Sequence, residues 1–124
     1  ATNDIAENTG PYNEDYTFGN IISMVELAKA NEIKVILTTT LPAAVFGWRP
    51  EIKDAPQKIE ALNKRLKAYA KAHRIPFVDY YSQMVKEDSK ALIPEYTKDG
   101  VHPTVEGYKV MESLIKPVID KALH

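Results

Sequence analysis

Two short apolar runs constrain the fold of this chain more than any other feature of its sequence. Residues 34–40 contain an uninterrupted apolar run at positions 35–37, followed by three threonines, and residues 75–81 contain a second run. A run that is apolar on both faces is typical of a strand buried in a parallel sheet. Because helical patterns alternate with these runs, the order of elements predicts an α/β fold with parallel strands and right-handed crossovers.

Three longer segments have apolar residues at helical spacing, and each begins at a residue type that caps helices. We expect the first helix to begin at Thr17 and to end at Asn31. The second follows Asp54, with Gln57 in the capping-box position, and the third follows Thr104. The apolar positions are Phe18, Ile21, Ile22, Val25 and Ala28 in the first helix, Ile59, Leu62, Leu66, Tyr69 and Ala70 in the second, and Tyr108, Met111, Leu114, Ile115 and Val118 in the third.

The remaining segments are expected to form loops and short elements. Residues 1–16 are polar and turn-rich, and we expect a strand end that continues into an active-site loop. A short helix is expected over residues 82–86, followed by a connection over residues 87–98. Residues 43–53 are too irregular for a helix and leave the C-terminal end of a strand, where open α/β sheets bind their ligands. Trp48 in that segment either lines a substrate cleft or anchors the loop, and the sequence leaves both readings open.

The composition argues against several classes of function. With 16 basic and 17 acidic side chains and no basic stripe, the chain has little that would bind nucleic acid. No apolar run approaches the roughly 20 residues that a transmembrane helix needs. The absence of cysteine excludes disulfides, cysteine metal sites and a cysteine nucleophile. The length of 124 residues allows one domain.

Residues 98–104 carry the clearest chemical signal in the chain. Asp99 and His102 are three residues apart, and Gly100 and Pro103 indicate a loop instead of a helix interior. A carboxylate beside an imidazole can fix its tautomer and stabilise the imidazolium that forms when the ring takes up a proton. The alternative is a surface loop whose histidine is solvated.

Two motifs at opposite ends of the chain, taken together, resemble one enzyme family. Thr2-Asn3-Asp4 near the start and Asp99 to His102 near the end are similar to blocks of the SGNH (GDSL-type) esterase and acylhydrolase superfamily. The resemblance implies a flavodoxin-like three-layer α/β/α fold with a parallel sheet, of which this chain holds the C-terminal strands and helices. It also implies a serine-dependent hydrolase of lipid, carbohydrate or small acyl esters.

The same resemblance implies a role for each matched residue. His102 corresponds to the catalytic base and Asp99 to the group that orients it, while Asn3 matches an asparagine that donates to the oxyanion. Trp48 is a candidate substrate-binding residue, because it is the aromatic side chain of the loop that follows a strand. We expect no metal and no cofactor, since Asp79 at a strand end has no second ligand at metal spacing.

Two parts of the family pattern are absent from residues 1–124. These are the Gly-Asp-Ser block of the nucleophile and the block that supplies an oxyanion-hole glycine; Ala1 also stands where the asparagine block has a glycine. We therefore expect residues 1–124 to be the C-terminal part of a single SGNH hydrolase domain, inactive and not self-sufficient as a fold on their own. The serines lie outside any Gly-Asp-Ser context; they are Ser23, Ser82, Ser89 and Ser113.

The missing nucleophile also sets the expected partners. Besides an ester substrate, the chain would need the N-terminal segment of the same protein or a second copy of itself. The alternative is a non-enzymatic α/β module or an inactive fragment, in which the loop at residues 99–102 is incidental. The residues themselves leave the compartment open, and only the family resemblance favours a secreted or periplasmic protein.

Overall fold

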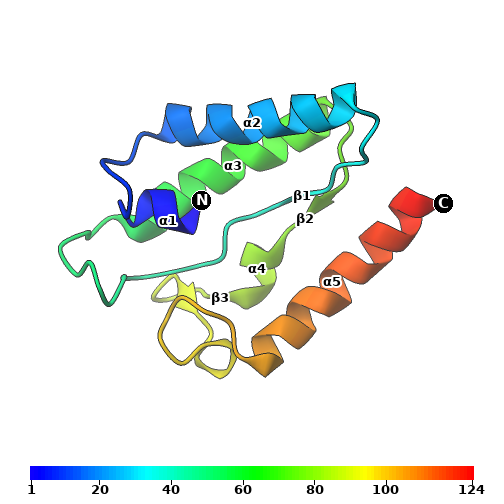
Figure 1. The fold of residues 1–124 in the computed structure, drawn as a ribbon. Coiled ribbons are helices and arrows are strands. Elements are labelled where there is room, and N and C mark those ends of the chain that lie inside the picture. The colour runs from blue at the N-terminus through cyan, green and yellow to red at the C-terminus, as the bar shows by residue number, and fades with distance from the viewer.

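A pair of parallel strands lies at the centre of the structure, a computed structural model that describes residues 1–124 (Figure 1). β1 (Leu37–Thr38) pairs with β2 (Phe77–Val78), with Leu37 in register with Phe77 and Thr38 in register with Val78. The predicted parallel pairing of the two apolar runs is therefore confirmed. Each strand is nevertheless only two residues long, which is shorter than the apolar run that contains it.

The polar residues that follow the strands explain why β2 is short. The Asp79 carboxylate accepts a hydrogen bond from the backbone N–H of Ser82 at 3.0 Å and caps helix α4 (Tyr80–Met84) directly after the strand. The Thr39 hydroxyl, just past β1, accepts from the backbone N–H of Tyr81 at 2.9 Å. These side chains replace the ladder bonds that a longer strand would make, so the helix begins two residues before the predicted position, residue 82.

Long helices cover both sides of the strand pair (Figure 1). α2 (Glu14–Ala30) packs against α3 (Ala55–Ala72), which contacts β1, while α5 (Val105–Leu123) contacts β2 from the other side. The mixed α/β class is confirmed, with a helical majority and two small sheets. None of the helices is both long enough and apolar enough to cross a membrane.

The observed helix ends agree with some of the predicted caps and differ from others. α2 begins at Glu14 instead of Thr17, because the Asn13 side chain accepts from the backbone N–H of Tyr16 at 3.0 Å. Its predicted end at Asn31 is confirmed. Asp54 does precede α3, but its carboxylate makes no capping hydrogen bond and instead pairs with Lys58 at 3.2 Å. For α5 the predicted cap is confirmed: the Thr104 hydroxyl accepts from Gly107.

The N-terminal segment is helical where a strand end was predicted. Residues Thr2–Ile5 form the short helix α1, which ends with Glu7 in the left-handed region at φ 57°. The backbone N–H of Glu7 bonds to Asp4 and that of Asn8 bonds to Asn3, the pattern of a Schellman cap. The prediction fails because a helix of four residues has no apolar period for the sequence to reveal.

The connection before the last helix is also more ordered than predicted. Strands β3 (Val85–Lys86) and β4 (Ala91–Leu92) form a two-stranded antiparallel hairpin. A single turn of 3₁₀ helix, η1 (Pro94–Tyr96), follows and contacts α5. The predicted helix over residues 82–86 therefore ends at Met84, since the next two residues belong to the hairpin.

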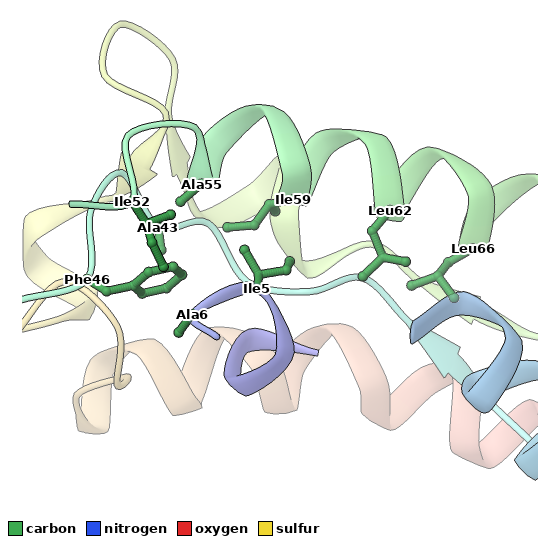
Figure 2. Close-up of a cluster of buried hydrophobic side chains, with 9 residues drawn as sticks. All are labelled: Ile5, Ala6, Ala43, Phe46, Ile52, Ala55, Ile59, Leu62 and Leu66. Carbon is green, nitrogen blue, oxygen red and sulfur yellow. The ribbon is translucent and has the colours of Figure 1, made fainter. Parts of the chain in front are cut away.

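The main hydrophobic cluster joins α1, the loop after β1 and α3 (Figure 2). The predicted inward face of α3 is confirmed at Ile59, Leu62 and Leu66, which are all buried. On α5 the predicted face is half-buried at Met111 and its neighbours. The prediction that Tyr108 belongs to this face is wrong, because Tyr108 is 58% exposed. The cluster consists of Ile5, Ala6, Ala43, Phe46, Ile52, Ala55, Ile59, Leu62 and Leu66.

Gly107, in the first turn of α5, generates a prediction about stability. A Cβ at this position would lie 2.7 Å from the backbone oxygen of Tyr96 in η1. Alanine is normally worth about 1 kcal/mol over glycine inside a helix, but forcing a backbone shift typically costs about 1–3 kcal/mol. We expect Gly107→Ala to lower the free energy of unfolding of the full-length protein by up to about 2 kcal/mol, measured by denaturant titration.

Gly19 in α2 provides the matched control. A Cβ there would meet no atom within 4 Å, so Gly19→Ala should stabilise the protein by up to about 1 kcal/mol. If both alanine variants were equally stabilising, the close packing of α5 against η1 would be contradicted.

Candidate active site

The loop before α5 brings Asp99 and His102 into direct contact. Nδ1 of the imidazole lies 2.7 Å from Oδ2 of the carboxylate. The other carboxylate oxygen, Oδ1, accepts from the backbone N–H groups of Val101 at 2.8 Å and His102 at 2.7 Å. Gly100, between Asp99 and Val101, has φ +86°, a conformation that suits glycine. One oxygen of Asp99 therefore shapes the loop while the other holds the ring.

This hydrogen bonding keeps Asp99 ionised. The backbone N–H groups of His102 and Val101, followed by the His102 ring, hold the pKa of the Asp99 carboxyl well below its usual range. An anion opposite Nδ1 favours the tautomer whose proton is on Nδ1, which leaves Nε2 as the free acceptor. A histidine in this tautomer is prepared to accept a proton at Nε2.

Thr97 and Thr104 fasten the loop at its two ends. The Thr97 hydroxyl accepts from the backbone N–H of Gly100 at 3.0 Å and donates to the backbone oxygen of His102 at 2.8 Å. The Thr104 hydroxyl donates to the backbone oxygen of Glu95 at 2.9 Å while it caps α5. Thr104 was predicted as a cap, but Thr97 was missed. The signal for Thr97 was its place just before a turn, where a threonine hydroxyl often accepts a hydrogen bond from a nearby backbone N–H.

The paired side chains lie open to solvent. The side chain of His102 is 75% exposed and that of Asp99 is 53% exposed. Both line a shallow pocket of about 640 Å³ together with Lys98, Thr104 and other residues of the loop and of the start of α5. A molecule arriving from solution can therefore reach the ring without any movement of the chain.

Asn3 lies on α1 with an exposed side chain. Its side-chain oxygen Oδ1 accepts a hydrogen bond from Nδ2 of Asn8 at 3.1 Å. The side-chain oxygen of Asn8 in turn accepts from the indole N–H of Trp48 at 2.8 Å. No hydrogen bond within the chain uses the side-chain nitrogen of Asn3, so its N–H groups are free to donate to another molecule. Asn8 was not identified from the sequence.

Asn3 and His102 do not touch each other in the structure. No hydrogen bond joins them, and the pocket lined by His102 does not include Asn3. They share a support instead, because Val101 packs against the main cluster that contains Ile5 and Ala6. The structure therefore brings Asp99 and His102 together and mounts Asn3 on the same hydrophobic cluster without contact.

Trp48 anchors its loop and remains half-exposed. Its ring packs on the buried ring of Phe46, with a centroid distance of 5.4 Å and an interplanar angle of 40°, and 47% of the residue is exposed. The next residue, Arg49, donates to the backbone oxygen of Glu7 at 2.9 Å. Of the two roles considered for Trp48, the anchoring contact is present, and one part of the ring stays accessible.

The other candidate groups lie outside this arrangement. No serine within residues 1–124 forms a hydrogen bond with His102, and Ser82 is occupied by Asp79 at 2.6 Å. His73 stacks on Tyr69 at the end of α3, with ring centroids 4.1 Å apart. No three carboxylate or imidazole side chains gather into a cluster that could hold a metal ion.

Comparison with solved structures finds close likenesses. A crystal structure from Bacteroides fragilis, described as a putative acylhydrolase, is 75% identical with a TM-score of 0.99 and is matched over 100% of this chain and 60% of its own length. A GDSL-like lipase from Bacteroides thetaiotaomicron is 72% identical with a TM-score of 0.97, over 98% of this chain and 60% of its own. This chain thus spans about three-fifths of either protein.

A more distant likeness extends to the fold alone. The esterase domain of a zebrafish retrotransposon protein is 18% identical with a TM-score of 0.71, matched over 92% of this chain and 63% of its own. No curated protein sequence matches the chain.

The family assignment rests on residues 1–110, which match the model of the GDSL-like lipase/acylhydrolase family. The matched range includes both motifs from which the resemblance was inferred, at residues 2–4 and 99–102. The two similar Bacteroides structures agree with this match. The chain belongs to the GDSL-like lipase/acylhydrolase family.

Proposed function

We propose that the protein containing this chain is a serine-dependent ester hydrolase in which His102 is the general base. The observation that supports this most strongly is the 2.7 Å contact between Nδ1 of His102 and the Asp99 carboxylate. That contact leaves Nε2 free on a ring that solvent can reach. A histidine held in this way is suited to activating a hydroxyl nucleophile.

In the proposed reaction, a serine supplied from outside residues 1–124 attacks the carbonyl carbon of the ester. Nε2 of His102 takes the proton of the serine hydroxyl, and the Asp99 anion stabilises the imidazolium that results. His102 then gives the proton to the departing alcohol, which leaves an acyl-enzyme. Water, deprotonated by the same ring, attacks the acyl-enzyme and releases the acid.

Asn3 is proposed as a donor to the oxyanion of the tetrahedral intermediates. Its side-chain nitrogen has no partner within the chain, and its oxygen is held by Asn8 at 3.1 Å. Donors that already point to where negative charge develops need no reorganisation during the reaction, and removing one typically costs about 100- to 1000-fold in kcat. Asn3 and His102 would then act on one substrate brought between them.

The larger fold proposed for the whole protein is the flavodoxin-like three-layer α/β/α arrangement. β1 has a strand partner on one side only, and an open pocket of about 420 Å³ runs along its residues, lined also by Ile21, Leu66 and Met111 from the flanking helices. Helices already lie on both sides of the strand pair (Figure 1). Further parallel strands paired with the free edge of β1 would cover these apolar side chains.

The proposed substrates are acyl esters of lipids, carbohydrates or small alcohols. Trp48 is proposed to contact the substrate, because part of its ring is exposed while the rest is held by Phe46 and Asn8. An exposed aromatic face suits either an acyl chain or a sugar ring. The open pocket beside His102 sets no narrow limit on the size of the leaving alcohol.

Replacing His102 tests the proposed base. The full-length protein is expected to hydrolyse p-nitrophenyl acetate, and His102→Ala should lower kcat by roughly four to six orders of magnitude, because the imidazole that Asp99 orients is the proposed acceptor of the serine proton. His73→Ala is the matched control: His73 stacks on Tyr69 at the far end of α3, so its loss should leave turnover unchanged. Unchanged turnover in His102→Ala would remove His102 from the mechanism.

Replacing Asp99 tests the origin of its low pKa through stability. A carboxyl whose pKa is lowered by folding stabilises the protein fully above the unfolded value near 3.9, and this contribution disappears as the pH falls through the folded value. We therefore expect Asp99→Asn to lower the melting temperature throughout the range from about pH 5 to pH 8, and the difference to shrink below about pH 4.

Glu112→Gln is the control for this experiment, because the Glu112 side chain is exposed on α5 and forms no ion pair or hydrogen bond. Its melting temperature should follow that of the unmodified protein at each pH. A pH-independent difference for Asp99→Asn down to the acid limit would contradict the hydrogen-bonded anion.

A further inference from the structure

The side chains of Trp48, Asn8 and Asn3 form a continuous chain of hydrogen bonds, here called the relay, beside the proposed oxyanion site. The indole N–H of Trp48 donates to Oδ1 of Asn8 at 2.8 Å. Nδ2 of Asn8 donates to Oδ1 of Asn3 at 3.1 Å. Trp48 and Asn8 are 40 residues apart in sequence, so the relay exists only because the loop at residues 43–53 folds back over α1.

The chemistry of the first donor fixes the direction of every bond in the relay. An indole N–H can only donate, so the atom of Asn8 that faces Trp48 has to be the oxygen. The nitrogen of Asn8 is then turned toward Asn3, where only the oxygen of the Asn3 amide can accept from it. The Asn3 nitrogen is consequently left on the open side, with its N–H groups unused.

Packing and backbone bonds hold the relay in place. The Trp48 ring packs on Phe46, which is completely buried in the main cluster beside Ala6 (Figure 2). The backbone N–H of Asn8 also bonds to the backbone oxygen of Asn3 at 3.1 Å, so these two residues are joined twice. The Trp48 ring is therefore fixed at one end of the relay, and the backbones of Asn3 and Asn8 are fixed at the other.

We propose that Asn8 and Trp48 are positioning residues that keep the N–H groups of the Asn3 amide directed toward the substrate oxyanion. The inference rests on the proposed function, in which Asn3 is the oxyanion donor. Without the relay, the amide of an exposed asparagine could rotate and present its oxygen instead. An oxygen in that position would repel the developing negative charge.

The substitution Asn8→Asp tests the polarity of the relay with almost no change in shape. A carboxylate still accepts from Trp48 but cannot donate to Oδ1 of Asn3, so the Asn3 amide should turn and donate its own nitrogen to Asp. We expect kcat for p-nitrophenyl acetate, measured on the full-length protein, to fall by about 100- to 1000-fold with KM little changed. Trp48→Phe keeps the aromatic packing and removes only the N–H; a loss of roughly 3- to 10-fold in kcat is expected.

Two comparisons separate positioning from a merely structural role. In a protein that already carries Asn3→Ala, adding Asn8→Asp should cause no further loss of kcat, because the residue through which Asn8 acts is gone. Asn20→Asp makes the same charge change on the exposed side of α2, where the Asn20 side chain forms no hydrogen bond, and should leave kcat unchanged. The melting temperature of each variant is measured to check that it is folded.

The outcomes distinguish this inference from the proposed function. If His102→Ala or Asn3→Ala kept full turnover, the proposed function would fail and the positioning role with it. If both lost activity while Asn8→Asp kept its kcat, or if Asn8→Asp cost as much in the Asn3→Ala background as in the unmodified protein, only the relay would be overturned.

Discussion

Burial of Phe46 and Ile5 in one cluster is the constraint on which the candidate site depends. Both side chains are completely buried, and burying an apolar side chain of this size is worth about 1.5–3 kcal/mol. Asn3 lies two residues before Ile5, Trp48 lies two residues after Phe46, and Val101 beside His102 packs on the same cluster. The candidate site residues, which are spread over about 100 residues of sequence, are therefore all attached to one hydrophobic cluster.

Hydrogen bonds then set the orientation of each group on that cluster. Asp99 uses one oxygen for two backbone N–H groups and the other for the imidazole, so the same bonds that lower its pKa also shape the loop. Asn8 acts in a similar way toward Asn3, since it is joined to that residue through backbone and side chain. In both places the polar group is exposed, and precision comes from bonds within a short stretch of chain.

The sequence predicts the parts of this arrangement that are local and periodic. The inward face of α3, the Thr104 cap and the Asp99–His102 contact all depend on spacings of a few residues, and all are confirmed. α1 could not be predicted, because a helix of four residues has no apolar period, and its one apolar residue, Ile5, is buried by contacts with residues distant in sequence. The bond between Asn8 and Trp48 was missed for a related reason: it spans 40 residues, and nothing in the local sequence specifies it.

The tautomer of His102 is the most direct measure of whether Asp99 prepares the ring as a base. It can be read from the nitrogen chemical shifts of the full-length protein labelled with ¹⁵N at histidine, at a pH where the imidazoles are neutral. The account predicts that His102 carries its proton on Nδ1, facing Oδ2 of Asp99, and that Nε2 is unprotonated. A His102 protonated on Nε2, or an even mixture of tautomers, would contradict it.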